Sequence, residues 1–159
     1  MSYRNLSDSS RVWIYQSNRQ LSDTEVKQIQ AEGEGFVKKW AAHGAELNAA
    51  IAVFYNRFIV LFADESQVIA SGCSIDTSIN FIKSLENKYQ IDLFDRLNIA
   101  YKVDDRIECL KMSDFQEALN SGRISENTIV FNNLVETKAS FENAWEVAVK
   151  ESWHAQLMA

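Results

Sequence analysis

The stretch Leu47-Asn-Ala-Ala-Ile-Ala-Val-Phe-Tyr55-Asn56-Arg57-Phe58-Ile-Val-Leu-Phe-Ala63 decides the fold. It contains two apolar runs, residues 47–55 and 58–63, that are rich in β-branched and aromatic side chains and are typical of strands. Only Asn56-Arg57 separates them, which predicts a tight hairpin. Arg is a poor residue for positive φ, so a type I turn with a bulge is the expected geometry.

A strand and a helix precede this hairpin. Residues Arg11–Ser17 (Arg-Val-Trp-Ile-Tyr-Gln-Ser) have strand composition, and Ser22 followed by Glu25 forms a capping box that starts a helix. Apolar residues then recur at helical spacing, which predicts one buried face. Gly33 and Gly35 each weaken this helix relative to Ala, so a bend or close packing is expected there.

A second helix and a second hairpin follow. Ser74 or Asp76 is expected to cap a helix that runs to about Tyr89. Residues 97–103 and 107–112 then predict two strands joined at Asp104-Asp105, and a short helix after Ser113 ends near Gly122.

The first six elements run β-α-β-β-α-β, which predicts an α+β fold with a ferredoxin-like core. In that core both helices cover one face of an antiparallel sheet, and right-handed crossovers place the first and third strands centrally. The second hairpin strand and residues 124–159 are an added hairpin and a C-terminal extension. Residues 1–10 are polar and are expected to form a flexible arm, with a single domain over 11–159.

Composition narrows the function classes. The 159 residues are 47% hydrophobic and 24% charged, with a net charge of −6, which is typical of a globular domain. The negative charge argues against nucleic-acid or anionic-membrane partners, because both favour clustered Lys and Arg. Two unpaired cysteines and no apolar run near 20 residues favour a reducing, cytoplasmic setting.

Catalytic motifs with a known mechanism are absent from the sequence. None of the five glycines is followed by Lys, so there is no P-loop. Gly-x-Gly-x-x-Gly, Gly-x-Ser-x-Gly and Cys-x-x-Cys are also missing. Cys73, Cys109, His43 and His154 have the right chemistry for zinc but no close pair at ligand spacing, so neither a metal nor a cofactor is expected.

Ser71-Gly72-Cys73-Ser74-Ile75-Asp76 is the most reactive-looking segment. A thiol at a helix N-terminus faces unpaired N–H groups, which favour a thiolate and can hold an oxyanion. His154 or His43 would supply the base. Asp76 opposes this hypothesis with its own charge, and the alternative is that Cys73 is a small buried residue packed beneath the helix cap.

Polar residues beside apolar strands suggest a second kind of site. Asn56, Arg57, Asn132 and Asn133 either form turns or recognise a small anion, and Asp76 is a further candidate binding residue. Aromatic residues in the strand-like segments predict a sheet face that can be a platform for bases, a peptide or another subunit, with cover by the C-terminal segment or by a second copy of the chain as the favoured alternative.

Several segments together resemble a known family. They are Trp13-Ile-Tyr-Gln-Ser-Asn-Arg19, Tyr55-Asn-Arg-Phe-Ile-Val60, Ser71-Gly-Cys-Ser-Ile-Asp76, Asp92-Leu-Phe-Asp-Arg96, Phe131-Asn-Asn-Leu-Val135 and Glu151-Ser-Trp-His154. As a set they resemble a family of short, uncharacterised bacterial proteins often labelled "ABC transporter ATPase". The family pattern has Pro where Ala148 stands. The resemblance implies a stand-alone domain of unknown function, and the chain has neither the P-loop nor the Leu-Ser-Gly-Gly-Gln signature that the label requires.

Two function hypotheses follow from these observations. The first is a non-enzymatic binding or self-associating interaction module that forms a homo-oligomer or binds another partner. The alternative is a small thiol-dependent enzyme with Cys73 as nucleophile and His154 as base, in which Asn133 orients the base.

Overall fold

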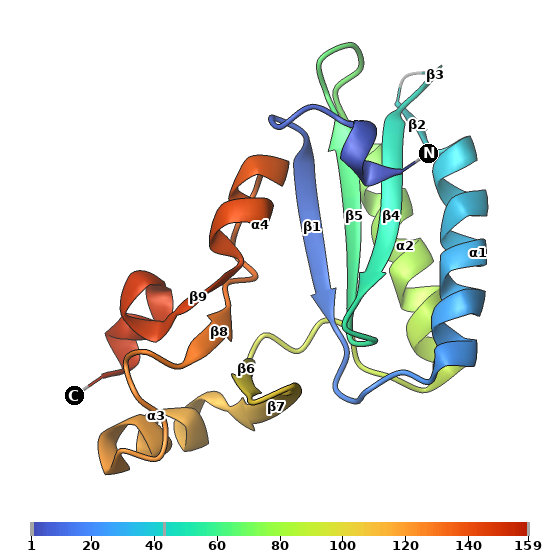
Figure 1. Cartoon of the computed structure of the whole chain (residues 1–159). Helices are drawn as coiled ribbons and strands as arrows, with labels where there is room; N and C mark the ends of the chain where they lie inside the picture. Colours follow the sequence, from blue (N-terminus) through green and yellow to red (C-terminus); the bar gives the residue numbers. More distant parts are fainter. Residues whose placement is uncertain (1, 43, 159) are drawn as a thin grey trace. The chain divides into compact units, whose positions relative to one another are not determined.

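A computed structural model describes residues 2–42 and 44–158. In chain order the elements are η1 (Tyr3–Asn5), β1 (Arg11–Gln16), α1 (Asp23–Lys39), β2 (Ala41–Ala42), β3 (Ala45–Glu46), β4 (Asn48–Phe54), β5 (Phe58–Asp64), α2 (Gly72–Tyr89), β6 (Asn98–Val103), β7 (Arg106–Lys111), α3 (Met112–Ser121), β8 (Ile129–Phe131), α4 (Lys138–Ala144), β9 (Glu146–Ala148), η2 (Val149–Glu151) and η3 (Trp153–Leu157) (Figure 1). This mixture of helices and antiparallel sheets confirms the α+β class. In the described part of the chain, no helix has both the length and the apolar character that crossing a membrane requires.

Contacts divide the chain into two compact units. Unit 1 contains residues 1–94 and 136–139, and unit 2 contains residues 95–135 and 140–159. Each unit has its own hydrophobic core. The single domain expected over 11–159 stays a prediction.

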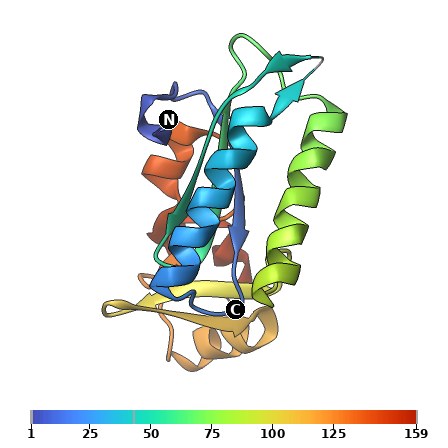
Figure 2. The ribbon, with the colours of Figure 1, turned by 90° about the vertical axis from the view of Figure 1, so that its right-hand side faces the viewer.

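Unit 1 is built on a three-stranded antiparallel sheet in the order β1-β5-β4. β1 and β4 therefore run parallel to each other on either side of β5, which is the split β-α-β arrangement. Both helices lie on the same face of the sheet, where they enclose one core with residues of all three strands (Figure 2). The predicted hairpin forms β4 and β5, and all residues of β5 except Asp64 are buried.

The ferredoxin-like strand order is not confirmed. That order would place the strand after α2 beside β1, but β6 lies in a second sheet of order β7-β6-β8-β9, where β7, its partner in the predicted second hairpin, takes one edge and β8 takes the other. Six consecutive residue pairs join β6 to β7 across a short turn, a local pairing that costs little loop entropy. The outer edge of β1 is occupied by residues 136 and 137: Val12 N–H donates to Glu136 O at 3.0 Å, and Arg11 bridges to Thr137.

Residues 2–10, which the sequence suggests are a flexible arm, include η1 and several inward-facing side chains. The Tyr3 ring stacks on Phe62 with centroids 4.7 Å apart and meets Phe54 edge-on. Leu6 and Ser10 are buried.

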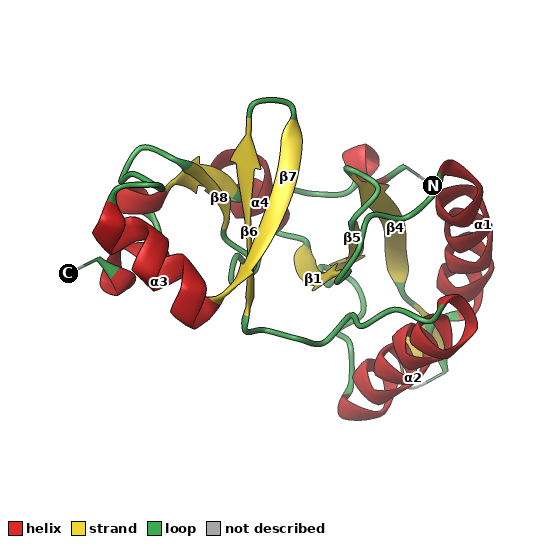
Figure 3. Ribbon diagram, turned by 90° about the horizontal axis from the view of Figure 1, so that it is seen from below, coloured by secondary structure: helices red, strands yellow, loops and turns green. Residues whose placement is uncertain are grey.

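Unit 2 packs α3 and the C-terminal segment around its sheet. Its core joins Ile99 of β6, Phe115 and Ala118 of α3, Val130 of β8 and Val149 of η2. Figure 3 shows the β6–β7 hairpin, with α3 following β7 directly.

Gly33 explains how closely α1 approaches the sheet. A Cβ at this position would lie 2.6 Å from Cγ2 of Ile51, a stiff, buried, β-branched side chain of β4. A Cβ at Gly35, on the same helix, would meet nothing within 4 Å. Of the two glycines at which a bend or close packing is expected, Gly33 is therefore closely packed and Gly35 is not.

The two glycines provide a matched test of this packing. We expect Gly33→Ala to lower the free energy of unfolding by about 1–3 kcal/mol through overpacking. Gly35→Ala should raise it by up to about 1 kcal/mol, because Ala is the better helix former. Urea unfolding of the two variants measures both changes, and equal effects at the two positions would contradict the close approach.

Candidate functional site

The structure places Cys73 on the surface of unit 1. It is exposed and is the second residue of α2. The alternative that Cys73 is a buried packing residue is therefore wrong. The helix begins earlier than expected, because Ser71 is the N-cap and its Oγ accepts from Ser74 N–H at 3.1 Å. Asp76 is exposed and lies beyond the first turn.

Hydroxyl groups near Cys73 are bonded to the helix itself. Ser74 Oγ donates to Ser71 O at 2.9 Å, and Thr77 Oγ1 donates to Cys73 O at 2.9 Å. Both hydroxyls therefore bond to backbone carbonyls at the start of α2.

His154 belongs to the core of unit 2. It is 1% exposed, and its ring stacks on Trp153 with centroids 3.9 Å apart. Nδ1 lies 2.6 Å from Ser152 Oγ, which also accepts from His154 N–H and so caps η3. Burial lowers the pKa of His154 to about 4, so its imidazole is neutral at pH 7. These properties are those of a core histidine; the other candidate base, His43, lies outside the described residues.

Asn132 and Asn133 form turn contacts inside unit 2. Asn132 Oδ1 accepts from Leu134 N–H at 3.1 Å, and Asn133 Oδ1 accepts from the Trp145 indole N–H at 2.9 Å. These bonds fit the turn interpretation, and Asn133 orients Trp145 rather than His154. Among the described residues, no group of three or more His, Cys, Asp or Glu side chains is placed to hold a metal ion.

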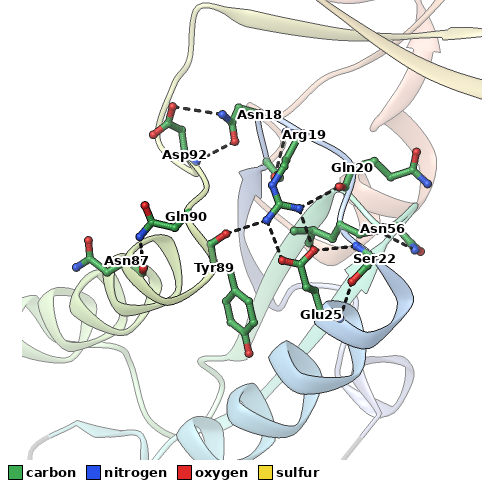
Figure 4. Close-up of polar contacts among 12 residues, drawn as sticks. Asn18, Arg19, Gln20, Ser22, Glu25, Asn56, Asn87, Tyr89, Gln90 and Asp92 are labelled. Atoms are coloured by element: carbon green, nitrogen blue, oxygen red, sulfur yellow. Dashed lines mark hydrogen bonds and ion pairs between the residues drawn. The ribbon is translucent and has the colours of Figure 1, made fainter.

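Several polar contacts lie at one end of the unit 1 sheet. We define the loop end as three segments: residues 17–22 between β1 and α1, residues 55–57 between β4 and β5, and residues 90–94 after α2. Figure 4 shows the Arg19 guanidinium directed toward the Glu25 carboxylate and the Tyr89 carbonyl.

Arg19 joins both helices of unit 1. Its Nη1 and Nη2 donate to the two carboxylate oxygens of Glu25 at 2.9 and 2.8 Å, and Nη2 also donates to Tyr89 O at 2.8 Å. Glu25 in turn accepts from Ser22 N–H, completing the predicted capping box. The hydrogen bonds from Arg19 are the main reason why the pKa of Glu25 falls to about 2. The guanidinium thus ties the start of α1 to the end of α2.

Asn18 and Asp92 join two of the loop-end segments. Asn18 N–H donates to Asp92 O at 3.1 Å, and Asp92 N–H donates to Asn18 Oδ1 at 2.9 Å. Leu93 beside them is buried, whereas Phe94 is 38% exposed and meets the Tyr15 ring edge-on.

Asn56 fastens the hairpin turn to the same region. Its Nδ2 donates to Asp23 Oδ1 at 2.8 Å and to Leu21 O at 3.2 Å, and Leu21 N–H donates to Asn56 O at 2.7 Å. Arg57 O accepts from Ser17 N–H at 2.7 Å. These bonds favour a positioning role for Asn56.

The turn geometry differs from the sequence-based expectation. The residues with positive φ are Tyr55 at 55° and Asn56 at 51°, one position earlier than Asn56-Arg57, and Arg57 N–H donates to Phe54 O. Two central residues with positive φ are typical of a type I′ turn. Asn adopts this conformation readily, but for an aromatic residue it is strained. Tyr55 is nevertheless 46% exposed.

The sequence alone does not indicate that Asn18, Arg19 and Glu25 belong to one cluster. The capping box and Asn18-Arg19 were visible signals, but their partners Tyr89 and Asp92 lie about 70 residues further along the chain. Arg19 donates its hydrogen bonds to Glu25 and to the Tyr89 carbonyl. We therefore call this cluster a brace: it holds the loops in place, and the exposed residues of the loops lie around it.

Burial of His154 gives a pH dependence with a definite sign. Its pKa is near 6.5 when unfolded and about 4 when folded, so the unfolded state binds the extra proton. We expect stability present above pH 6.5 to be lost as pH falls toward 4, by about 3 kcal/mol in total. Urea unfolding between pH 7 and 5 measures the upper part of this loss of stability. Protonation of Glu25 changes the stability mainly at lower pH. His154→Asn, which keeps an acceptor for Ser152, should flatten the profile; an unchanged slope would show that His154 is not its source.

The comparisons with known proteins give no family. No protein-family model, no curated protein and no solved structure matches the chain.

Proposed function

We propose that the protein is a non-enzymatic interaction module that binds a protein partner through the loop end of unit 1, and that a second copy of the chain is such a partner. The observation that carries this proposal is Tyr55, an exposed aromatic residue held in a strained backbone conformation. A cytoplasmic setting is part of the same proposal, as is membership of the family of stand-alone domains that the sequence resembles.

Tyr55 adopts a strained backbone conformation, and burial of its own side chain offsets only part of that cost. Gly or Asn would adopt φ near 55° at lower cost, and nearly half of the Tyr55 side chain remains exposed. Strained positions of this kind cluster at functional sites. Tyr is also among the residues enriched in protein interfaces, because it supplies a large contact area with few rotatable bonds.

The brace around Arg19 supports the same function. A surface made of three loops would lose conformational entropy on binding if the loops were mobile. Here Arg19, Asn18 and Asn56 bond each loop to a neighbouring element. Phe94, which is also partly exposed, adds a second aromatic contact from the 90–94 segment.

The alternative thiol-dependent enzyme has less support. Exposure of Cys73 is necessary for it, but an exposed thiol at a helix start is not sufficient. His154, the base of that hypothesis, is a buried, neutral imidazole whose Nδ1 lies against Ser152.

Replacing Tyr55 should change the stability of the fold and the strength of self-association in opposite directions. We expect Tyr55→Gly to raise the free energy of unfolding by about 1 kcal/mol, because it relieves the strain. The same change should weaken self-association at least tenfold, since the ring is the proposed contact. Urea unfolding and sedimentation equilibrium over a range of protein concentrations measure the two effects.

Asp104 is the matched control. It has φ of 55° in the β6–β7 turn of unit 2, so Asp104→Gly should stabilise the fold without changing association. A wild-type chain that stays monomeric at every concentration would exclude a second copy as partner. Association that is unchanged in Tyr55→Gly would exclude the loop end as the surface.

A further inference from the structure

Residues Glu136–Ala139, here named the strap, lie along the N-terminal residues of unit 1. Val12 N–H donates to Glu136 O at 3.0 Å, Lys138 N–H donates to Ser10 O at 2.8 Å, and Ala139 N–H donates to Asp8 O at 2.9 Å. A bridge between Arg11 and Thr137 completes the pairing. The strap therefore covers the start of the outer edge of β1.

Lys138 is the buried centre of this arrangement. The residue is 6% exposed, and its Nζ donates to Leu6 O at 2.8 Å and to Arg4 O at 3.2 Å. Asp8 Oδ1 lies 3.9 Å from the same atom on the solvent side, where its side chain is 82% exposed. A buried ammonium is tolerated only when polar partners surround it, and here residues 4–8 supply them.

The N-terminal residues depend on the strap in return. Arg4 O and Leu6 O are the carbonyls at η1 that Lys138 satisfies, and Ser10 O and Asp8 O accept from the strap backbone. Lifting either segment would leave buried polar groups of the other without these partners. The two segments therefore stabilise each other.

We propose that the strap and residues 2–10 open and close as one cooperative unit, with Lys138 as its latch, and that opening uncovers the edge of β1. Local opening of this kind involves contiguous elements that share contacts. In the open state Val12 N–H loses its acceptor, and an uncovered strand edge is a template for pairing with another strand. The strap thus acts as a built-in cover of this edge.

Hydrogen exchange of individual backbone amides, followed by NMR on the full chain, tests the latch. In Lys138→Met we expect the amides of Leu6, Ser10, Val12 and Ala139 to exchange roughly 10- to 100-fold faster than in the wild type, because two carbonyls lose a charged donor. Amides of α1, α2 and β4 should keep their wild-type rates. Lys88→Met, which removes an exposed ion pair with Glu32, is the control and should leave the exchange rates of all four amides unchanged.

Two results would overturn the proposal. Faster exchange of Ala139 alone, with Leu6 and Ser10 unchanged, would show that the segments open independently. No acceleration at any of these amides would show that Lys138 is not the latch. If Lys138→Met does not fold, native-state exchange of the wild type in low urea provides the test: Leu6, Val12 and Ala139 should share one opening free energy and one urea dependence, and different values would contradict a single unit.

Discussion

The hydrogen bonds of the Arg19 guanidinium to Glu25 and to the Tyr89 carbonyl are the constraint on which the loop end depends. One side chain meets the capping box of α1 and the last residue of α2, so the two helices are joined at the same end of the sheet. Bidentate Arg–carboxylate pairs are geometrically specific, which fixes the loops as well as stabilising them. The strained turn at Tyr55 is held against the same framework through Asn56. Rigidity of the surroundings allows one residue to remain in an unfavourable conformation.

The edges of the unit 1 sheet show a second common feature. On β4, Gln30 of α1 donates to Ile51 O, and Gly33 lets the helix approach closely enough to cover that strand. On β1, the strap covers the start of the edge and Lys138 holds it from within. Covering of exposed edges is one way in which proteins avoid unwanted strand pairing. The two covers differ physically, because α1 is a long helix with an extensive apolar face, whereas the strap is four residues held by polar contacts.

Elements that depend on local signals could be predicted from the sequence. The capping box at Ser22, the β4–β5 hairpin, the close packing at Gly33 and the helix that begins beside Cys73 all follow from spacing and residue type. The β6–β7 hairpin could be predicted, but the absence of β6 from the sheet of β1 could not, because the competitor for the edge of β1 is a short segment more than 120 residues away that has no strand signature. The one-residue shift of the turn could not be predicted either, since tertiary bonds of Asn56 place positive φ on Tyr55 against its own preference. The Arg19 brace could not be predicted either, because Arg19 reaches α2 through the backbone carbonyl of Tyr89, and a backbone carbonyl carries no residue-specific signal.

A double-mutant cycle on Arg19 and Glu25 measures how strongly the loop end depends on the contact between these two side chains. The free energies of unfolding of the wild type, Arg19→Met, Glu25→Gln and the double variant would be measured in urea at neutral pH and moderate salt. Arg19 is 42% exposed, so solvent reduces the energy of the pair, but the account predicts a coupling of about 1 kcal/mol because the contact is bidentate and braced by Tyr89 O. Strictly additive effects of the two substitutions would contradict it, and would mean that the Arg19–Glu25 pair adds nothing to the stability of the loop end.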